Sequence, residues 1–304
     1  MSCPLLCAPS GSGYPVEYLV ARIRARMGDG GVRRLLPAAE NAPLACFDDR
    51  EIEHAAQQER HWLHHQMDGP TRGQLFPVFV YSELGRLFNL LRLREEGHET
   101  EVALFADTLL HHHVINAYHH LRSPLEFITV LDGLLGRSLG QPCGLASAYA
   151  KRGLAGAEER WIHAVLTWGQ KEPWPTMVRA YSRHLIDRHN SRKLYQWQRW
   201  QLTVPCPLIE GGRHGSKRLT RMLKSGTLSP ANPSNGRGPE GALPLELASR
   251  HQLRAMLLSH AREHDALAVI LLYLDHLGEQ QVVLRTEACQ RHPSFPQPTA
   301  KASP

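Results

Sequence analysis

Residues 80–97 read VYSELGRLFNLLRLREEG, and the spacing of apolar side chains in this stretch indicates the fold class. These side chains recur at three- and four-residue steps, at Val80, Leu84, Leu87, Phe88 and Leu91. That period places them on one face of an α-helix. Pro77 precedes the stretch and Gly97 closes it, so the sequence predicts a helix that begins just after Pro77 and ends near Gly97.

The same helical period recurs on both sides of this stretch. It predicts helices near 16–27, 177–202, 253–260 and 266–277, and shorter ones at 51–66, 101–121, 125–136 and 157–169. Val, Ile and Thr are sparse and rarely alternate with polar residues, so signals for β-strands are weak. The sequence therefore predicts an all-α protein.

Three long amphipathic stretches each carry aromatic or leucine residues near their N-terminal end and basic residues near their C-terminal end. They are residues 80–97, 184–202 and 271–288, and they follow one another at intervals of roughly 90 to 105 residues. So long a period suggests triplicated helical modules rather than a solenoid of short repeats. We divide the chain into a flexible N-terminus (1–13), three helical modules (14–121, 122–208 and 209–292), a Pro/Gly-rich loop within the third module (225–244) and a disordered tail (293–304).

Composition and charge narrow the functional classes. The chain has 304 residues, 42% of them hydrophobic, and 35 basic against 29 acidic residues give a formal charge of +6. This is a globular composition with a mildly basic surface. The densest apolar run, 266–274, is shorter than the roughly 20 residues that span a bilayer, so we expect at most a peripheral membrane protein. Six cysteines without a CxxC pair suggest reduced thiols.

Catalytic signatures are missing from the sequence. It contains no GxSxG, no HExxH and no GxxxxGK[ST], so no catalytic, cofactor-binding or nucleotide-binding residues are predicted. Histidine is abundant, with 19 copies, and eight of them lie in the two segments 61–65 and 111–120. On a helix, His61 and His65 share a face, a spacing that metal ligands use. The pattern also places His112 and His113 approximately on one face with His119 and His120. Because no Cys or carboxylate stands nearby at ligand spacing, polar helix surface is favoured and no metal is predicted. A helical hydrolase that uses these histidines is one alternative.

The segment 188–200, RHNSRKLYQWQRW, interleaves basic and aromatic residues. Such a pattern can neutralise phosphates and stack on bases, so a helical adaptor that binds nucleic acid here is a second alternative. The favoured interpretation is an amphipathic helix with its aromatic side chains in the core and its arginines exposed.

Four stretches together resemble the C-subunit family of V-type (V/A-type) ATP synthases, whose relatives include the d subunits of eukaryotic V-ATPases. The first, YLVARIRARMGDGGVRRLL (18–36), carries the Tyr, Ala-Arg-hydrophobic-Arg and Leu-Leu pattern of that family's N-terminus. The others are 81–102, 189–223 and 266–288, and the resemblance covers roughly residues 14–290 in order. Two departures are Arg86, where the family has Asn, and the loop 225–244, which stands in place of the third module's opening helices.

This resemblance implies an architecture and a function. The family is built from three similar helical modules arranged as a funnel with pseudo-threefold symmetry, and it has no catalytic residues. Its members lie on the cytoplasmic face of a membrane, between the central stalk of a rotary ATPase and its proteolipid ring, and couple ATP turnover to proton or sodium transport. Arg22 and Arg26 share one face of the predicted N-terminal helix, so we predict that they contact the stalk. No cofactor, nucleic acid or small-molecule substrate is expected.

Overall fold

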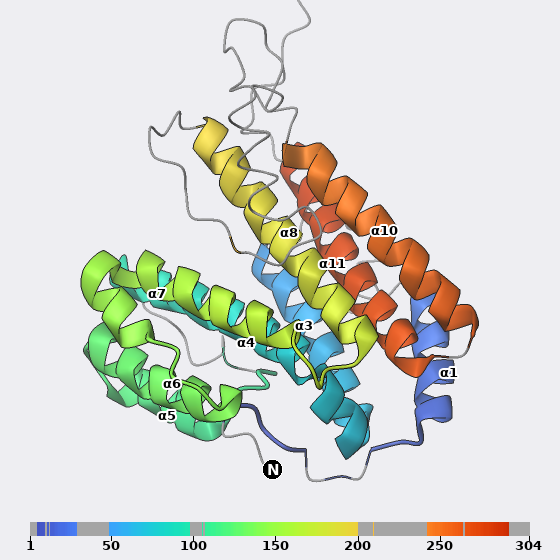
Figure 1. Cartoon of the computed structure of the whole chain (residues 1–304), viewed down its shortest axis with the longest axis horizontal. Helices are drawn as coiled ribbons and strands as arrows, with labels where there is room; N and C mark the ends of the chain where they lie inside the picture. Colours follow the sequence, from blue (N-terminus) through green and yellow to red (C-terminus); the bar gives the residue numbers. More distant parts are fainter. Residues whose placement is uncertain are drawn as a thin grey trace, which may run out of the picture. The chain divides into compact units, whose positions relative to one another are not determined.

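The computed structural model describes residues 5–9, 11, 13–28, 49–97, 105, 107–199, 209, 242–263 and 265–291. Within these ranges the chain is all-helical, with no β-strand, which confirms the predicted fold class (Figure 1). The helices are α1 (Val16–Gly28), α3 (Asp49–Gln66), α4 (Gly69–Glu95), α5 (His112–His120), α6 (Pro124–Leu139), α7 (Leu145–Gly169), α8 (Thr176–Arg199), α10 (Ala242–Arg262) and α11 (Ala266–Arg291).

The chain divides into two compact units. A larger unit comprises Met1–Ser10 and Gly69–Ala268, and a smaller unit comprises Gly11–Asp68 and Val269–Pro304. The larger unit therefore holds helices α4 to α10, and the smaller unit holds α1, α3 and most of α11. These two units do not follow the three consecutive modules expected from the sequence. The three-module funnel stays a prediction.

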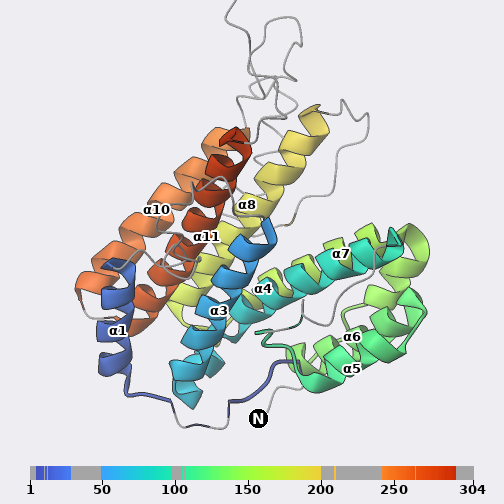
Figure 2. The ribbon, with the colours of Figure 1, turned by 180° about the vertical axis from the view of Figure 1, so that it is seen from behind.

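Helix α4 is one of three helices, α4, α7 and α8, that pack against one another in the larger unit. It packs against α7 and α8, α8 packs in turn against α10, and α6 lies between α5 and α7 (Figures 1 and 2). The predicted start of α4 after Pro77 is wrong, because the helix already begins at Gly69 and contains Pro77. A proline inside a helix removes one backbone hydrogen bond. Pro77 is buried, and its ring packs closely against Gly169 at the end of α7.

Trp161 of α7 is the largest fully buried side chain among the described residues and leaves 1% of its surface exposed. Its ring centre lies 5.6 Å from those of both Tyr81 and Phe88 on α4. Its indole nitrogen is buried and has no hydrogen-bond partner within the described ranges. The aromatic contacts thus fix α7 on α4 through packing.

Buried polar side chains hold other parts of the larger unit together. Glu83 of α4, 1% exposed, accepts hydrogen bonds from the Thr108 hydroxyl at 2.6 Å and the Leu109 amide at 3.1 Å. Asn190 of α8 donates to the carbonyl of Ile209 and accepts from its amide, both at 2.9 Å. Such satisfied polar contacts specify which segments meet.

Helices α8 and α10 share a buried polar chain of three residues. The Ser249 hydroxyl of α10 donates to Asp187 Oδ2 at 3.0 Å and lies 3.1 Å from His184 Nδ1. All three side chains are nearly inaccessible to water. Because the hydroxyl hydrogen goes to the carboxylate, the serine oxygen is left to accept from the imidazole. This arrangement fixes the register between the two helices.

The N-terminal segment is tied to the larger unit where the structure describes it, which differs from the flexible N-terminus expected over 1–13. The Cys7 amide donates to the Leu109 carbonyl at 2.8 Å, and the His111 amide donates to the Leu5 carbonyl at 2.9 Å. Leu5 and Leu6 are buried. These two leucines enter a core that is formed by distant residues, so nothing in their local sequence indicates the contact.

The structure differs from the sequence prediction at the starts of helices α10 and α5. Helix α10 begins at Ala242, so the last residues of the expected loop 225–244 are helical, and the rest of that loop lies outside the described residues. Helix α5 starts only at His112, because the residues just before it pair with the N-terminal segment. The expected tail 293–304 also lies outside the described ranges.

The smaller unit is built from α1, α3 and α11. Leu19 and Ile23 form the buried face of α1, and the Tyr14 amide donates to the Gln66 carbonyl at the end of α3 at 2.9 Å. Residues Ala266–Thr286 of α11 are long and apolar enough to span a membrane, by length and composition alone. No such segment was expected from the sequence. Half of its most apolar window is buried within the protein.

Candidate functional site

Arg26, one of the two predicted stalk contacts, is engaged inside the smaller unit. Its Nη1 lies 2.6 and 2.7 Å from the two carboxylate oxygens of Glu59 on α3. The Arg26 side chain is 18% exposed and that of Glu59 is 1% exposed. The guanidinium also lies 3.6 Å from the ring centre of Trp62, within the range of a cation–π interaction. This geometry makes Arg26 one half of a buried ion pair.

Tyr273 of α11 completes the environment of Glu59. Its hydroxyl donates to Glu59 Oε2, and its ring meets Trp62 edge to face with 6.4 Å between ring centres. Burial, together with the hydrogen bond to the carboxylate, raises the pKa of Tyr273 well above that of a free tyrosine. Tyr273 therefore stays a neutral hydrogen-bond donor over the physiological pH range.

Arg22, the second predicted stalk contact, is half-buried but has no buried carboxylate beside it in the described part of the chain. Its Nη1 donates to Gln66 Oε1 at 3.4 Å, and its guanidinium lies 5.6 Å from the ring centre of Trp62. Its guanidinium lies 5.5 Å from the ring centre of Tyr14 and 5.8 Å from that of Tyr18. Tyr14 is 40% exposed and Tyr18 is 51% exposed. Tyrosine and arginine are enriched among the residues that dominate protein–protein interfaces. We call Tyr14, Tyr18 and Arg22 the Tyr–Arg patch.

The segment 188–200, a candidate for binding nucleic acid, carries cations that already have carboxylate partners. Arg188 Nε lies 3.2 Å from Glu246 Oε1 on α10, and Lys193 pairs with Glu159 on α7. Phosphate binding would have to compete with these pairs. The side chains from Leu194 onward, including Trp197 and Trp200, lie outside the described residues. Nucleic-acid binding through this segment stays a prediction.

His189, in the same segment, sits in an environment that opposes a positive charge. Burial and the nearby ammonium of Lys193 lower its pKa to about 4, although the carboxylate of Glu159 partly offsets them. Its Nε2 is buried and has no hydrogen-bond partner in the described part of the chain. His189 is therefore neutral near pH 7.

This environment predicts a loss of stability on acidification. In the unfolded chain His189 has a pKa of about 6.5, whereas in the folded chain its pKa is about 4. Between these two pH values the unfolded chain therefore binds a proton that the folded chain does not bind. The free energy of unfolding should fall by about 3 kcal/mol over this window because of His189 alone. Urea denaturation across the window should show a shallower fall for His189→Leu than for wild type. Equal pH dependence in the two proteins would contradict the assignment.

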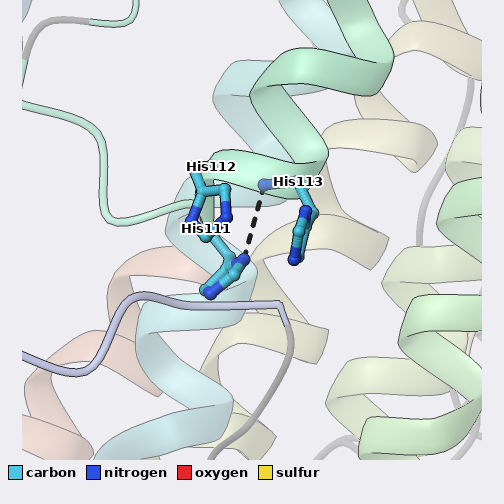
Figure 3. Close-up of side chains that lie close together, drawn as sticks. All are labelled: His111, His112 and His113. Atoms are coloured by element: carbon cyan, nitrogen blue, oxygen red, sulfur yellow. Dashed lines mark hydrogen bonds between the residues drawn. The ribbon is translucent and has the colours of Figure 1, made fainter.

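Two histidine groups come together in the structure. His61 and His65 stack on α3 with 3.9 Å between ring centres, and His65 Nδ1 lies 2.9 Å from the His61 carbonyl, which confirms that they share a face. His111, His112 and His113 meet at the start of α5 (Figure 3). The sequence pattern had placed His112 and His113 with His119 and His120. In the structure the His119 ring packs on Phe105 instead, with 5.3 Å between ring centres.

The missed member of the second group is His111, which is the N-cap of α5. Its backbone is extended, and its side chain accepts a hydrogen bond from the His113 amide at 3.4 Å. Consecutive residues within a helix point about 100° apart, so three adjacent imidazoles converge only because the first lies before the helix. A histidine directly before a predicted helix start is the sequence signal that could have indicated this.

A shallow cavity lies along α6 and the connection to α7, with a volume of about 510 Å³. Three glycines line it together with Thr129, Asp132 and Arg137. Asp132 Oδ2 accepts a hydrogen bond from the Ala146 amide at 3.2 Å and so caps the start of α7. The acidic group of this cavity thus already has a structural role.

No protein family matches the chain, and no curated protein sequence matches it. The resemblance to the C-subunit family of V-type ATP synthases therefore rests on the four stretches quoted above and on their order.

Proposed function

We propose that this protein is a non-catalytic coupling subunit of a rotary V/A-type ATPase or ATP synthase. In this role it would lie on the cytoplasmic face of the membrane, peripheral to it, between the central stalk and the proteolipid ring. It would need no cofactor and would transmit torque for proton or sodium transport. The proposed arrangement is the three-module funnel implied by the family resemblance.

Rigid helices support this proposal. Residues 81–95, 189–199 and 266–288 of three family-like stretches lie on the long helices α4, α8 and α11. A part that transmits torque must resist sliding between helices. The aromatic packing around Trp161 and the buried polar contacts of Glu83 and Asn190 provide such resistance within the larger unit.

The observation that carries the proposal is the Tyr–Arg patch at the start of α1. Tyr18 and Arg22 lie in the first family-like stretch (18–36), and Tyr14 and Tyr18 are exposed beside Arg22. A half-buried arginine beside two exposed tyrosines suits an acidic protein partner. We propose that this patch, rather than Arg26, contacts the stalk, because Arg26 already forms an ion pair with the buried carboxylate of Glu59.

Affinity purification of the tagged full-length chain from detergent-solubilised native membranes tests the proposal. We expect stalk and ring subunits of a rotary ATPase to co-purify. Removing two anchor residues of the patch, in Tyr18→Ala with Arg22→Ala, should weaken stalk binding by about 2 kcal/mol or more, which is roughly thirtyfold.

The matched control is Arg24→Ala, on another face of α1, which should leave co-purification unchanged. Full recovery of the stalk with the double variant would exclude the patch as the interface. If ATPase subunits present in the membranes did not co-purify with the wild-type chain, the proposed function would be wrong. Recovery of nucleic acid instead would favour the adaptor alternative.

A further inference from the structure

Three imidazole rings meet where the chain enters α5. The ring centres of His111 and His112 are 4.1 Å apart, those of His112 and His113 are 4.1 Å apart, and those of His111 and His113 are 4.8 Å apart. One nitrogen from each ring lies within 4.8 Å of the other two. Figure 3 shows the three side chains facing one another on the outside of the helix start. In the described part of the chain, no other group of three His, Cys, Asp or Glu side chains converges in this way.

The backbone beneath these rings is held in place. The His111 amide donates to the Leu5 carbonyl at 2.9 Å, and the His111 carbonyl accepts from the Val114 amide at 2.8 Å. Val114 and Tyr118 anchor α5 in the core. His112 and His113 are exposed, so their side chains can rotate towards a common point while the backbone stays fixed.

We propose that His111, His112 and His113 form a binding site for a divalent transition-metal ion that prefers imidazole ligands, of the Zn²⁺ or Cu²⁺ type. Neutral imidazole nitrogen is a ligand that both ions favour. Tetrahedral Zn²⁺ with Zn–N bonds of about 2.0–2.1 Å needs nitrogens about 3.3 Å apart. Side-chain rotations that bring the nitrogens up to about 1.5 Å closer together convert the present arrangement to that spacing.

Two features act against binding. The helix N-terminus disfavours a cation by up to about fivefold. The capping hydrogen bond also occupies Nδ1 of His111, which places that ring's proton on Nε2.

The capping hydrogen bond between the His113 amide and His111 Nδ1 provides a specific experimental test of metal binding. To bind a metal, His111 must release Nδ1 from the His113 amide, or must move its proton to Nδ1 so that Nε2 can coordinate. Either change breaks the capping hydrogen bond. The His113 amide should therefore respond to the metal, whereas weak adsorption to scattered surface histidines would leave it unchanged.

The rival site is the stacked pair on α3. His65 Nδ1 lies 2.9 Å from the His61 carbonyl, so the ring donates there and its Nε2 is left available, the orientation that backbone carbonyls commonly give to metal-binding histidines. That pair offers two imidazoles where the α5 group offers three. With 19 histidines in the chain, the experiment must separate these two sites.

The test is calorimetric titration of the full-length, metal-free protein with Zn²⁺ in a buffer that does not bind metals. The cluster variant combines His111→Asn, His112→Gln and His113→Gln, in which Asn retains a capping oxygen. The control variant combines His61→Gln and His65→Gln. We expect wild type and control to bind one Zn²⁺ more tightly than the remaining sites, within about twofold of each other, and the cluster variant to lose at least about tenfold in affinity.

Nuclear magnetic resonance of the wild-type protein gives the second readout, a shift of the His113 amide that saturates with one equivalent of Zn²⁺. Should the cluster variant lose helical circular dichroism, His112→Gln alone replaces it, because that side chain is exposed, and a loss of about tenfold is again expected. Retention of tight Zn²⁺ binding by the cluster variant would overturn the proposal. So would loss of binding in the control, an unresponsive His113 amide, or no Zn²⁺ binding distinguishable from scattered surface sites.

Discussion

Replacing Arg26 with methionine is expected to destabilise the smaller unit by about 3–5 kcal/mol, a large part of the stability of a typical domain. The guanidinium lies 2.6 Å from Glu59, whose side chain is 1% exposed. Methionine preserves much of the apolar contact with Trp62 but leaves the carboxylate buried without its cationic partner. Urea denaturation, followed by fluorescence of the tryptophans, measures the loss.

The double variant Arg26→Met with Glu59→Gln is the matched control. Glutamine can still accept the hydrogen bond from Tyr273 but carries no charge, so this variant should recover most of the lost stability. A cost below about 1 kcal/mol for Arg26→Met would mean that the pair behaves like a surface ion pair. In that case Arg26 would be available to a partner, as predicted from the sequence.

The buried position of Arg26 determines which variants can test coupling. Charge reversal of Arg26 would place two carboxylates side by side in the core of the smaller unit. If such a variant were assayed for ATP-driven ion pumping, a loss of pumping would reflect misfolding rather than a lost contact with the stalk. Tyr18 is exposed, and Arg22 is half-buried and hydrogen-bonds to the neutral Gln66 rather than to a buried carboxylate, so both can be changed with less effect on folding. Variants of the Tyr–Arg patch are therefore the informative ones for stalk binding.

Replacing Trp161 with alanine is the second change expected to have a large effect, a loss of about 3–5 kcal/mol from the larger unit. The side chain is 1% exposed and lies against Tyr81 and Phe88 of α4, so its removal leaves a cavity between α4 and α7. Thermal or urea denaturation of the variant measures the loss.

Two variants separate cavity formation from other causes. Trp174→Ala removes the same side chain from a half-buried position beside Trp168 and should cost about 1 kcal/mol. Trp161→Phe keeps most of the packing and removes the buried indole N–H, which has no partner among the described residues, so it should cost about 1.5 kcal/mol or less. A loss for Trp161→Ala no larger than for Trp174→Ala would contradict the packing of α7 on α4.

The local sequence predicted the helices where their apolar period was strong. The segments at 16–27, 51–66 and 125–136 correspond to α1, α3 and α6, because each needs one buried stripe and the stripe is visible in the residue spacing. The prediction from local sequence was wrong at Pro77, where it placed the start of the helix that in fact begins at Gly69. Proline is a helix breaker by local chemistry, and the packing against Gly169 that accompanies it inside α4 comes from a residue far away in the chain.

The candidate sites divide in the same way. The helical repeat was enough to predict the all-α class and the shared face of His61 and His65. The pairing of Arg26 with Glu59 and Tyr273, the exposed tyrosines beside Arg22, and the burial of Leu5 and Leu6 became visible only in the folded chain. So did the position of His111 over the start of α5. The physical reason is that helical periodicity is set by neighbours along the chain, whereas burial, ion pairing and capping depend on which distant segments meet.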